Sequence, residues 1–431
     1  MKILEVAGAI GKEDTIPRGL TGPSAPIALT RVAFLDNLRY LMVVFVLVYH
    51  SFGAYATVAP HWVVHDTSSF AADIIRELFD VFMMPVLFFV AGYFALASLE
   101  KKGAWGFLKD KVKRLLIPLA LVVLIVLPLA IYDQPIKPVR PFWKYWLWYL
   151  SSFEVRLRFT QAPEGPTTQA IYWFISLLFA FFLLFALVFV LTRRWRSGGI
   201  LLAERKATSG NSVFVVLVVF GLLTFAGYFI LLLLFPDSSW FTLHMLLEFQ
   251  VTRLVPYTGY FVFGVYAHQS RGWFAEGKPL GSVALWAVIS GVLVVAYLVV
   301  GQPMFANTAG TANLSVGFLL AFAFIRSFLL LSLLVVLVSF GVHYWNHSST
   351  LDRQLSGTSY NIYLTHYWFV VGIQAALLKW ASGPVLAKVA IVFVAALALS
   401  YAISRWVLAR HSRAFMLAIL TLFVFCLAVR P

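Results

Sequence analysis

The sequence predicts an all-α protein that crosses a membrane many times. Hydrophobic residues make up 61% of its 431 residues and charged residues only 12%, whereas about 25% of the residues in a soluble domain are charged. One water-soluble core cannot bury so much apolar surface. The apolar residues are also gathered into runs of about 20, the length that crosses a bilayer as a helix. We therefore expect a polytopic membrane protein whose solvent is mostly lipid.

Ten apolar runs are long enough to span. They fall near 38–58, 77–98, 114–132, 170–192, 212–235, 254–270, 282–301, 316–340, 358–379 and 385–408. An eleventh run, 414–429, is short, and both a span and an interfacial helix remain open for it. The aromatic segment Phe142–Leu150 is too short to cross, so we expect it at the membrane interface or as a re-entrant piece.

Basic residues predict the orientation and the domain limits. With alternating spans, about two thirds of the Lys and Arg lie on the side of the N-terminus, half of these in 99–114 and 193–206. The N-terminus is therefore predicted to be cytoplasmic, in a multi-pass protein of the inner membrane. The charged, Pro-containing segment 1–30 reads as a flexible tail without a signal peptide. Residues 31–410 form one membrane domain, and 411–431 hold the last apolar segment.

The net charge of +15 follows from this topology, because the cations lie in short segments between apolar runs. No nucleic-acid partner is expected. Cys426 is the single cysteine, which excludes internal disulfides and multi-cysteine metal sites. We expect no metal and no tightly bound cofactor.

The first span carries the most informative polar residues, Asp36, Arg39 and His50. Arg39 and His50 are eleven residues apart, which is about three helical turns plus 20°, so all three share one face. Arg39 is expected near the cytoplasmic surface and His50 about 16 Å deeper, in mid-membrane. A buried imidazole can take a proton from a hydroxyl. Alternatively, Arg39 is an anchor and His50 a hydrogen-bonded residue between helices; the shared face favours the functional interpretation.

Three further features follow. Lys111, Lys113 and Arg114 stand where the third span begins, at a helix N-terminus that can hold phosphate, or they only mark the cytoplasmic side. Gly92 lies in an aromatic run and permits close approach of another helix or of a ligand. Deep in the later spans lie Arg326, which serves in an ion pair or as an anion contact, and His366, which follows Tyr363 by three residues.

Together these segments resemble the acyltransferase 3 family of membrane acyltransferases. LDNLR at 35–39 followed by His50 is similar to its arginine, ten residues, histidine signature. Four more segments are similar to recurrent family elements, in order: FFVAGYF at 88–94, KVKRLLIP at 111–118, YFVFGVYAH at 260–268 and SYNIYLTH at 359–366. The segment FMMPVLFFVAGYF most resembles the branch of the family that includes glucan biosynthesis protein C, which modifies periplasmic glucans.

The resemblance implies an O-acyltransferase with cytoplasmic acyl-CoA, such as acetyl-CoA or succinyl-CoA, as donor. Its acceptor would be a hydroxyl of an extracytoplasmic or lipid-linked glycan. It makes His50 the catalytic base and Arg39 its support, and we expect Asp36 to orient Arg39. The two-arginine element of the family falls on Lys111 and Arg114, with Lys113 between them as a further phosphate contact. Lysine at the first position keeps the charge and loses bidentate geometry.

Substrate contacts are predicted at Arg326, Tyr363 and His366. A second hypothesis, from another class, is a transporter or flippase for a glycan or lipid precursor. It would use Arg326 and His366 as substrate contacts and His50 as a proton relay. A third is a membrane scaffold or sensor, which would tolerate substitution of Arg39 and His50. Turnover of acyl-CoA in detergent, where no gradient exists, separates the enzyme from a carrier.

Overall fold

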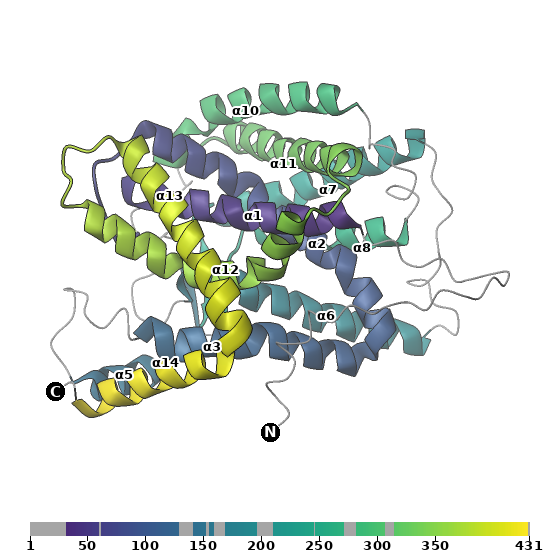
Figure 1. Cartoon of the computed structure of the whole chain (residues 1–431). Helices are drawn as coiled ribbons and strands as arrows, with labels where there is room; N and C mark the ends of the chain where they lie inside the picture. Colours follow the sequence, from purple (N-terminus) through teal and green to yellow (C-terminus); the bar gives the residue numbers. More distant parts are fainter. Residues whose placement is uncertain are drawn as a thin grey trace.

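The computed structural model describes residues 32–59, 62–128, 141–151, 155–158, 169–195, 210–244, 246–270, 282–306 and 314–429. Helices dominate this part of the chain and pack side by side into one bundle (Figure 1). The predicted tail 1–30 and most of the basic segment 193–206 lie outside the described residues.

The described residues form these helices, in chain order. They are α1 (Ala33–Ser51), η2 (Gly53–Tyr55), α2 (Phe70–Lys111), η3 (Val112–Leu116), α3 (Ile117–Leu121), η4 (Val122–Val126), α5 (Phe142–Ser151), η5 (Ala170–Tyr172), α6 (Trp173–Trp195), α7 (Gly210–Leu234), α8 (Leu254–Gln269), α10 (Val283–Ala306), α11 (Val316–Tyr344), α12 (Thr350–Leu377), α13 (Val385–Ala402), η7 (Ile403–Leu408) and α14 (Ala409–Val429). Each of the ten expected spans overlaps a helix of the described residues, which confirms the helical membrane class.

Within the described ranges, seven helical segments are long and apolar enough to cross a membrane. One of them, Phe70–Val126, has 57 residues and as a straight helix would measure about 85 Å, against a hydrocarbon core of about 30 Å. Gly103 interrupts it with φ 65° and ψ 168°, a conformation that a residue with a Cβ rarely adopts. This break separates the second expected span from the third. The count of ten or eleven spans stays a prediction.

Helix ends extend beyond the apolar runs that predicted them. α12 begins at Thr350 rather than near 358, because Ser349 and Asp352 form a reciprocal cap. The Ser349 hydroxyl accepts from the Asp352 amide at 3.0 Å, and the Asp352 carboxylate accepts from the Ser349 amide at 2.8 Å. Hydropathy detects only the apolar middle of such a helix, whereas the cap fixes its start.

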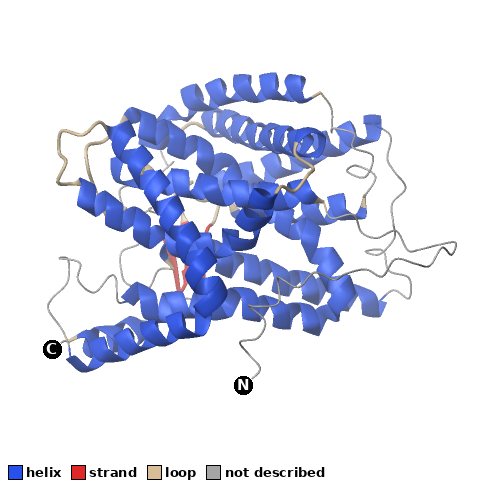
Figure 2. Cartoon of the chain, in the orientation of Figure 1, coloured by secondary structure: helices blue, strands red, loops and turns tan. Residues whose placement is uncertain are grey.

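A small β-sheet was not expected in an all-α protein. It has three antiparallel strands in the order β1 (Val155–Arg158), β2 (Trp240–Leu243) and β3 (Leu247–Gln250), drawn in red in Figure 2. Val155 pairs with Leu243, and Trp240 with Gln250. The sheet joins the chain after α5 to the hairpin between α7 and α8. Strands of four residues give too little alternation to be recognised in sequence.

Two glycines allow α2 and α8 to cross in close contact. A Cβ on Gly92 would lie 2.0 Å from the carbonyl oxygen of Phe261, and one on Gly264 would lie 2.0 Å from that of Phe89. No side chain fits at these distances, so each glycine lies directly against the backbone of the other helix. The close approach predicted for Gly92 is confirmed.

Contacts between helices and the segments that connect them define the two ends of the bundle. At one end Lys388, at the start of α13, pairs with Asp66 in the segment between α1 and α2 at 2.7 Å. At the other end the Asn37 side chain donates to the carbonyls of Trp345 and His347, both at 3.0 Å. If the expected spans alternate in direction, Lys388 and Asp66 lie on one side of the membrane, and Asn37, Trp345 and His347 lie on the other. α5 and α14 lie side by side along one edge (Figure 1), with Phe142 and Phe423 in edge-to-face contact.

Candidate active site

One face of α1 lies against α12 along its length. Near the start of α1, an Arg39 Nη donates to the Ser356 hydroxyl at 2.8 Å and pairs with Asp36 at 3.3 Å. Near its end, His50 contacts His366 of α12. The two helices run parallel, because residues eleven apart in α1 meet residues ten apart in α12. The shared face predicted for the three residues of α1 is therefore a face toward α12.

The two histidines form a hydrogen-bonded pair. His50 Nδ1 lies 2.9 Å from His366 Nε2, and the rings stack with 16° between their planes. His366 Nδ1 lies 2.7 Å from the Tyr363 carbonyl oxygen, which only accepts, so this nitrogen carries a proton. Its Nε2 then accepts, and His50 Nδ1 donates to it. These two hydrogen bonds place the proton of His50 on Nδ1 and its lone pair on Nε2. This Nε2 makes no hydrogen bond to any residue that the structure describes.

The segment after α1 covers this pair. The Trp62 ring stacks on His50 with centroids 5.2 Å apart, and His50 is only 7% exposed. The Trp62 Nε1 donates to the Gln374 side chain at 2.7 Å, and the Gln374 amide donates to the His50 and Ser51 carbonyls at 3.1 Å. We did not identify Trp62 or Gln374 from the sequence. An amide deep in the apolar run of α12 was the available signal for Gln374.

His50 lies in the last turn of α1 rather than in the middle of a span. The expected span, 38–58, was placed too far along the chain, because α1 ends at Ser51 and the following apolar residues form the covering segment. Arg39 is about 16 Å away along the helix and is bound to Ser356 and Asp36. This geometry is compatible with an Arg39 that holds the donor, but it excludes contact with a carbonyl group at His50.

The basic cluster Lys111, Lys113 and Arg114 lies inside a continuous helix, not at a helix N-terminus as predicted. The helix restarts after Gly103, and Lys111 leads into η3, a wider π-helical turn. The backbone N–H groups are therefore occupied, and only side chains can bind an anion here. Arg114 pairs with Asp110 at 2.9 Å. Lys111 lies 4.2 Å from the ring of Phe182 and within electrostatic range of Arg39.

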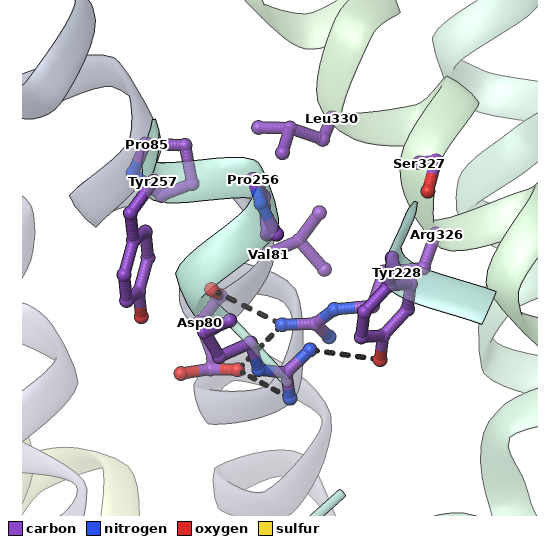
Figure 3. A pocket seen from close by; sticks show the side chains of 10 residues that line it. Asp80, Val81, Pro85, Tyr228, Pro256, Tyr257, Arg326, Ser327 and Leu330 are labelled. Atoms are coloured by element: carbon purple, nitrogen blue, oxygen red, sulfur yellow. Dashed lines mark hydrogen bonds and ion pairs between the residues drawn. The ribbon is translucent and has the colours of Figure 1, made fainter. Parts of the chain in front are cut away.

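Arg326 lies in a separate buried network between α2, α8 and α11. It pairs with Asp80 at 2.7 Å and donates to the Tyr297 hydroxyl at 2.5 Å. Arg253 reaches the same carboxylate at 3.2 Å and pairs with Asp237 at 2.7 Å. Figure 3 shows Arg326 turned toward Asp80. Of the two alternatives left open for Arg326, the structure shows the ion pair.

The pocket at this network, lined by residues including Tyr228 and Tyr257, has about 10 Å³ free for water-sized molecules, which is room for about one water. The other predicted substrate contact, Tyr363, has its hydroxyl bound to the Ile171 carbonyl at 2.7 Å. His366 is thus the member of the predicted substrate set that the structure brings to His50.

Comparison with known proteins defines the class. A family model described as an acyltransferase domain, that of the acyltransferase 3 family, matches residues 32–405. The match includes α1, α12 and the helices between them, and it covers most of the chain. The chain belongs to this family, and its apolar helices make it a multi-pass membrane acyltransferase. No curated protein and no solved structure matches the chain.

Proposed function

We propose that this acyltransferase moves an acyl group from cytoplasmic acyl-CoA to a hydroxyl of an extracytoplasmic or lipid-linked glycan, with His50 as general base. The observation that supports it most is the His50–His366 pair. A general base needs a lone pair that no neighbour occupies, and the hydrogen bonds of this pair leave one on His50 Nε2. The pair lies at the end of the bundle that the charge pattern predicts to be extracytoplasmic, as an acceptor on that side requires.

The donor would enter from the opposite end. Lys111, Lys113 and Arg114 supply cations there for the phosphates of CoA, and Arg39 lies within electrostatic range of Lys111. Asp36 holds Arg39 through their ion pair. From this end the thioester would extend along the α1–α12 contact toward His50. Acetyl-CoA and succinyl-CoA are the donors we propose to test.

At His50 the acceptor hydroxyl would give its proton to Nε2 while its oxygen attacks the thioester carbonyl. The C–O bond forms, the C–S bond breaks, and the proton passes from His50 to the departing thiolate. An alternative route forms an acyl-histidine first, which the hydroxyl then attacks. Both routes use the same lone pair. The protein would lie in the inner membrane with a cytoplasmic N-terminus, and a periplasmic glucan is the acceptor that the glucan biosynthesis protein C-like branch would favour.

The test is release of CoA by the purified full-length protein in detergent, supplied with acetyl-CoA or succinyl-CoA. His50→Ala should lower kcat by at least about 100-fold and leave acyl-CoA binding intact. The matched control is His343→Ala, which removes an exposed histidine of α11 and should change neither quantity. Full turnover by His50→Ala would remove this residue from the chemistry. A wild-type protein that binds no acyl-CoA and releases no CoA would favour the transporter or flippase.

A further inference from the structure

A third buried arginine, Arg76, lies beside His50. It belongs to the second turn of α2, which begins at Phe70 at the same end of the bundle. Its guanidinium carbon lies 3.9 Å from the ring centre of Tyr49 and 5.8 Å from that of Trp62, the ring that stacks on His50. It is also within electrostatic range of His50 itself. Arg76 is therefore close to the place where acyl transfer would occur.

The bonding of Arg76 differs from that of the other buried arginines. Arg253 and Arg326 each bind a carboxylate within 3.2 Å. Arg76 is only 7% exposed. In the described part of the chain, no carboxylate oxygen lies within 4.0 Å of its guanidinium nitrogens, so it forms no ion pair there. Its Nη1 donates to the Tyr49 carbonyl at 2.8 Å, and its Nε has no hydrogen-bond partner there.

A buried cation without a counter-ion is costly, since desolvation is offset only by pairing and hydrogen bonds. Asp80 lies within electrostatic range of Arg76 but is already shared by two other guanidinium groups. The unused donor of Arg76 is thus held, at a cost in stability, within a few ångströms of the rings that surround His50. Negative charge that appears there only during a reaction would find a donor already in place.

We propose that Arg76 is a catalytic residue that stabilises the negative charge on the carbonyl oxygen during acyl transfer; this rests on the function proposed above. When the hydroxyl oxygen attacks, the π electrons of the carbonyl move onto its oxygen, and the hydroxyl proton goes to His50 Nε2. Arg76 holds this oxyanion. The electrons then return, the C–S bond breaks, and sulfur leaves with the electron pair and takes the proton from His50. Arg39, at the other end of α1, cannot fill this role.

A purely structural function makes a different prediction. If Arg76 only ties α2 to the Tyr49 carbonyl, its loss should lower the melting temperature and the fraction of folded protein, while each folded molecule keeps its turnover. Oxyanion stabilisation requires a lower kcat per folded molecule with little change in KM, because the ground-state carbonyl carries little charge.

The experiment uses the full-length protein in detergent, with Arg76→Gln, Arg76→Lys and the control Arg353→Gln, which alters an exposed arginine of α12. CoA release from acetyl-CoA should fall by about 100-fold in kcat for Arg76→Gln, less for Arg76→Lys, and remain unchanged for the control. A second measurement compares the affinity for acetonyl-CoA, whose ketone mimics the substrate carbonyl, with that for trifluoroacetonyl-CoA, which hydrates to a tetrahedral group. The wild type should prefer the second, and Arg76→Gln should lose that preference.

Turnover of Arg76→Gln within twofold of wild type, or an unchanged preference for the tetrahedral analogue, would overturn the proposal while His50 keeps its role. If Arg76→Gln does not fold, Arg76→Lys decides. If Arg76→Lys prefers trifluoroacetonyl-CoA over acetonyl-CoA less strongly than the wild type does, at constant KM, the proposal is supported. If this preference is unchanged, the proposal is refuted. A wild-type protein that releases no CoA would instead refute the proposed function and this inference with it.

Discussion

The hydrogen bonds of His366 decide which nitrogen of His50 carries a proton. His366 donates to a backbone carbonyl that cannot donate in return, and this fixes the proton on His50 Nδ1. Without an acceptor at this position, the His50 ring is free to carry its proton on Nε2, the form that is inactive as a base. Under the proposed function, we expect His366 to act through His50, as a positioning residue.

We predict that His366→Phe, which keeps a ring for stacking and removes the acceptor, lowers kcat at least about tenfold with KM for acyl-CoA nearly unchanged. His366→Gln offers an amide oxygen to His50 Nδ1 and should recover part of the activity. Steady-state CoA release measures both. Equal activity of the two variants would show that packing, rather than the acceptor, is what His366 supplies.

At this scale the sequence identified part of the candidate site. Helical spacing put Asp36, Arg39 and His50 on one face, and His366 was singled out as a mid-span histidine, because charge in an apolar run is visible without a structure. Trp62 and Arg76 were not identified. Trp62 lies in the segment between η2 and α2, and Arg76 in the second turn of α2, and only tertiary packing brings them to His50.

Among the elements, the crossing of α2 and α8 is the contact with the least tolerance. Two backbones touch at Gly92 and Gly264, so any side chain at either position must push the helices apart. The site depends on this crossing, since Arg76 and the Asp80 network both lie on α2.

We predict that Gly92→Leu destabilises the protein by about 1–3 kcal/mol or more, measured as a lower melting temperature in detergent. Gly291→Ala is the matched control. It lies within α10, where an added Cβ meets no atom within 4 Å, and it should be neutral or slightly stabilising because alanine favours helix. A Gly92→Leu protein with wild-type stability would contradict the close crossing.

The segment between α1 and α2 is held over His50 by a buried ion pair. Lys388 is 1% exposed as a side chain, and Asp66 is its carboxylate partner at 2.7 Å. Burial alone would raise the pKa of Asp66, but the hydrogen bonds from Lys388 and Thr67 and the charge of Lys388 outweigh it and hold the pKa below its ordinary 3.8. A carboxyl group with a depressed pKa stabilises the folded state above its unfolded pKa, and this contribution disappears as pH falls through the folded value.

Asp66→Asn should therefore cost about 3–5 kcal/mol at neutral pH, because it leaves Lys388 buried without a counter-ion. The difference in melting temperature between wild type and Asp66→Asn should stay constant from pH 8 to about 5 and shrink below about pH 3.8, as protonated Asp66 becomes equivalent to asparagine. Melting curves across this range measure it. A gap that stays constant as pH falls from about 5 to about 3 would contradict the ion pair.

For the whole molecule, the proposed function places donor binding at one end of the bundle and the proton transfer at the other. Cations gather around Arg39 and Lys111 at one end, and the histidine pair lies at the other. Hydropathy predicted the helical membrane class, because apolar runs of membrane length have few alternatives to helix. The break at Gly103, the sheet and the covering segment were not predictable. They depend on backbone conformation and on partners far along the chain.

The central claim, transfer of an acyl group through His50, is tested most directly by mass spectrometry of glycans and lipids from cells that lack the gene. Complementation with the wild-type gene should restore an ester mass on a glycan or lipid-linked glycan, and the His50→Ala gene, expressed at the same level, should not. An ester restored equally by both genes would contradict the claim.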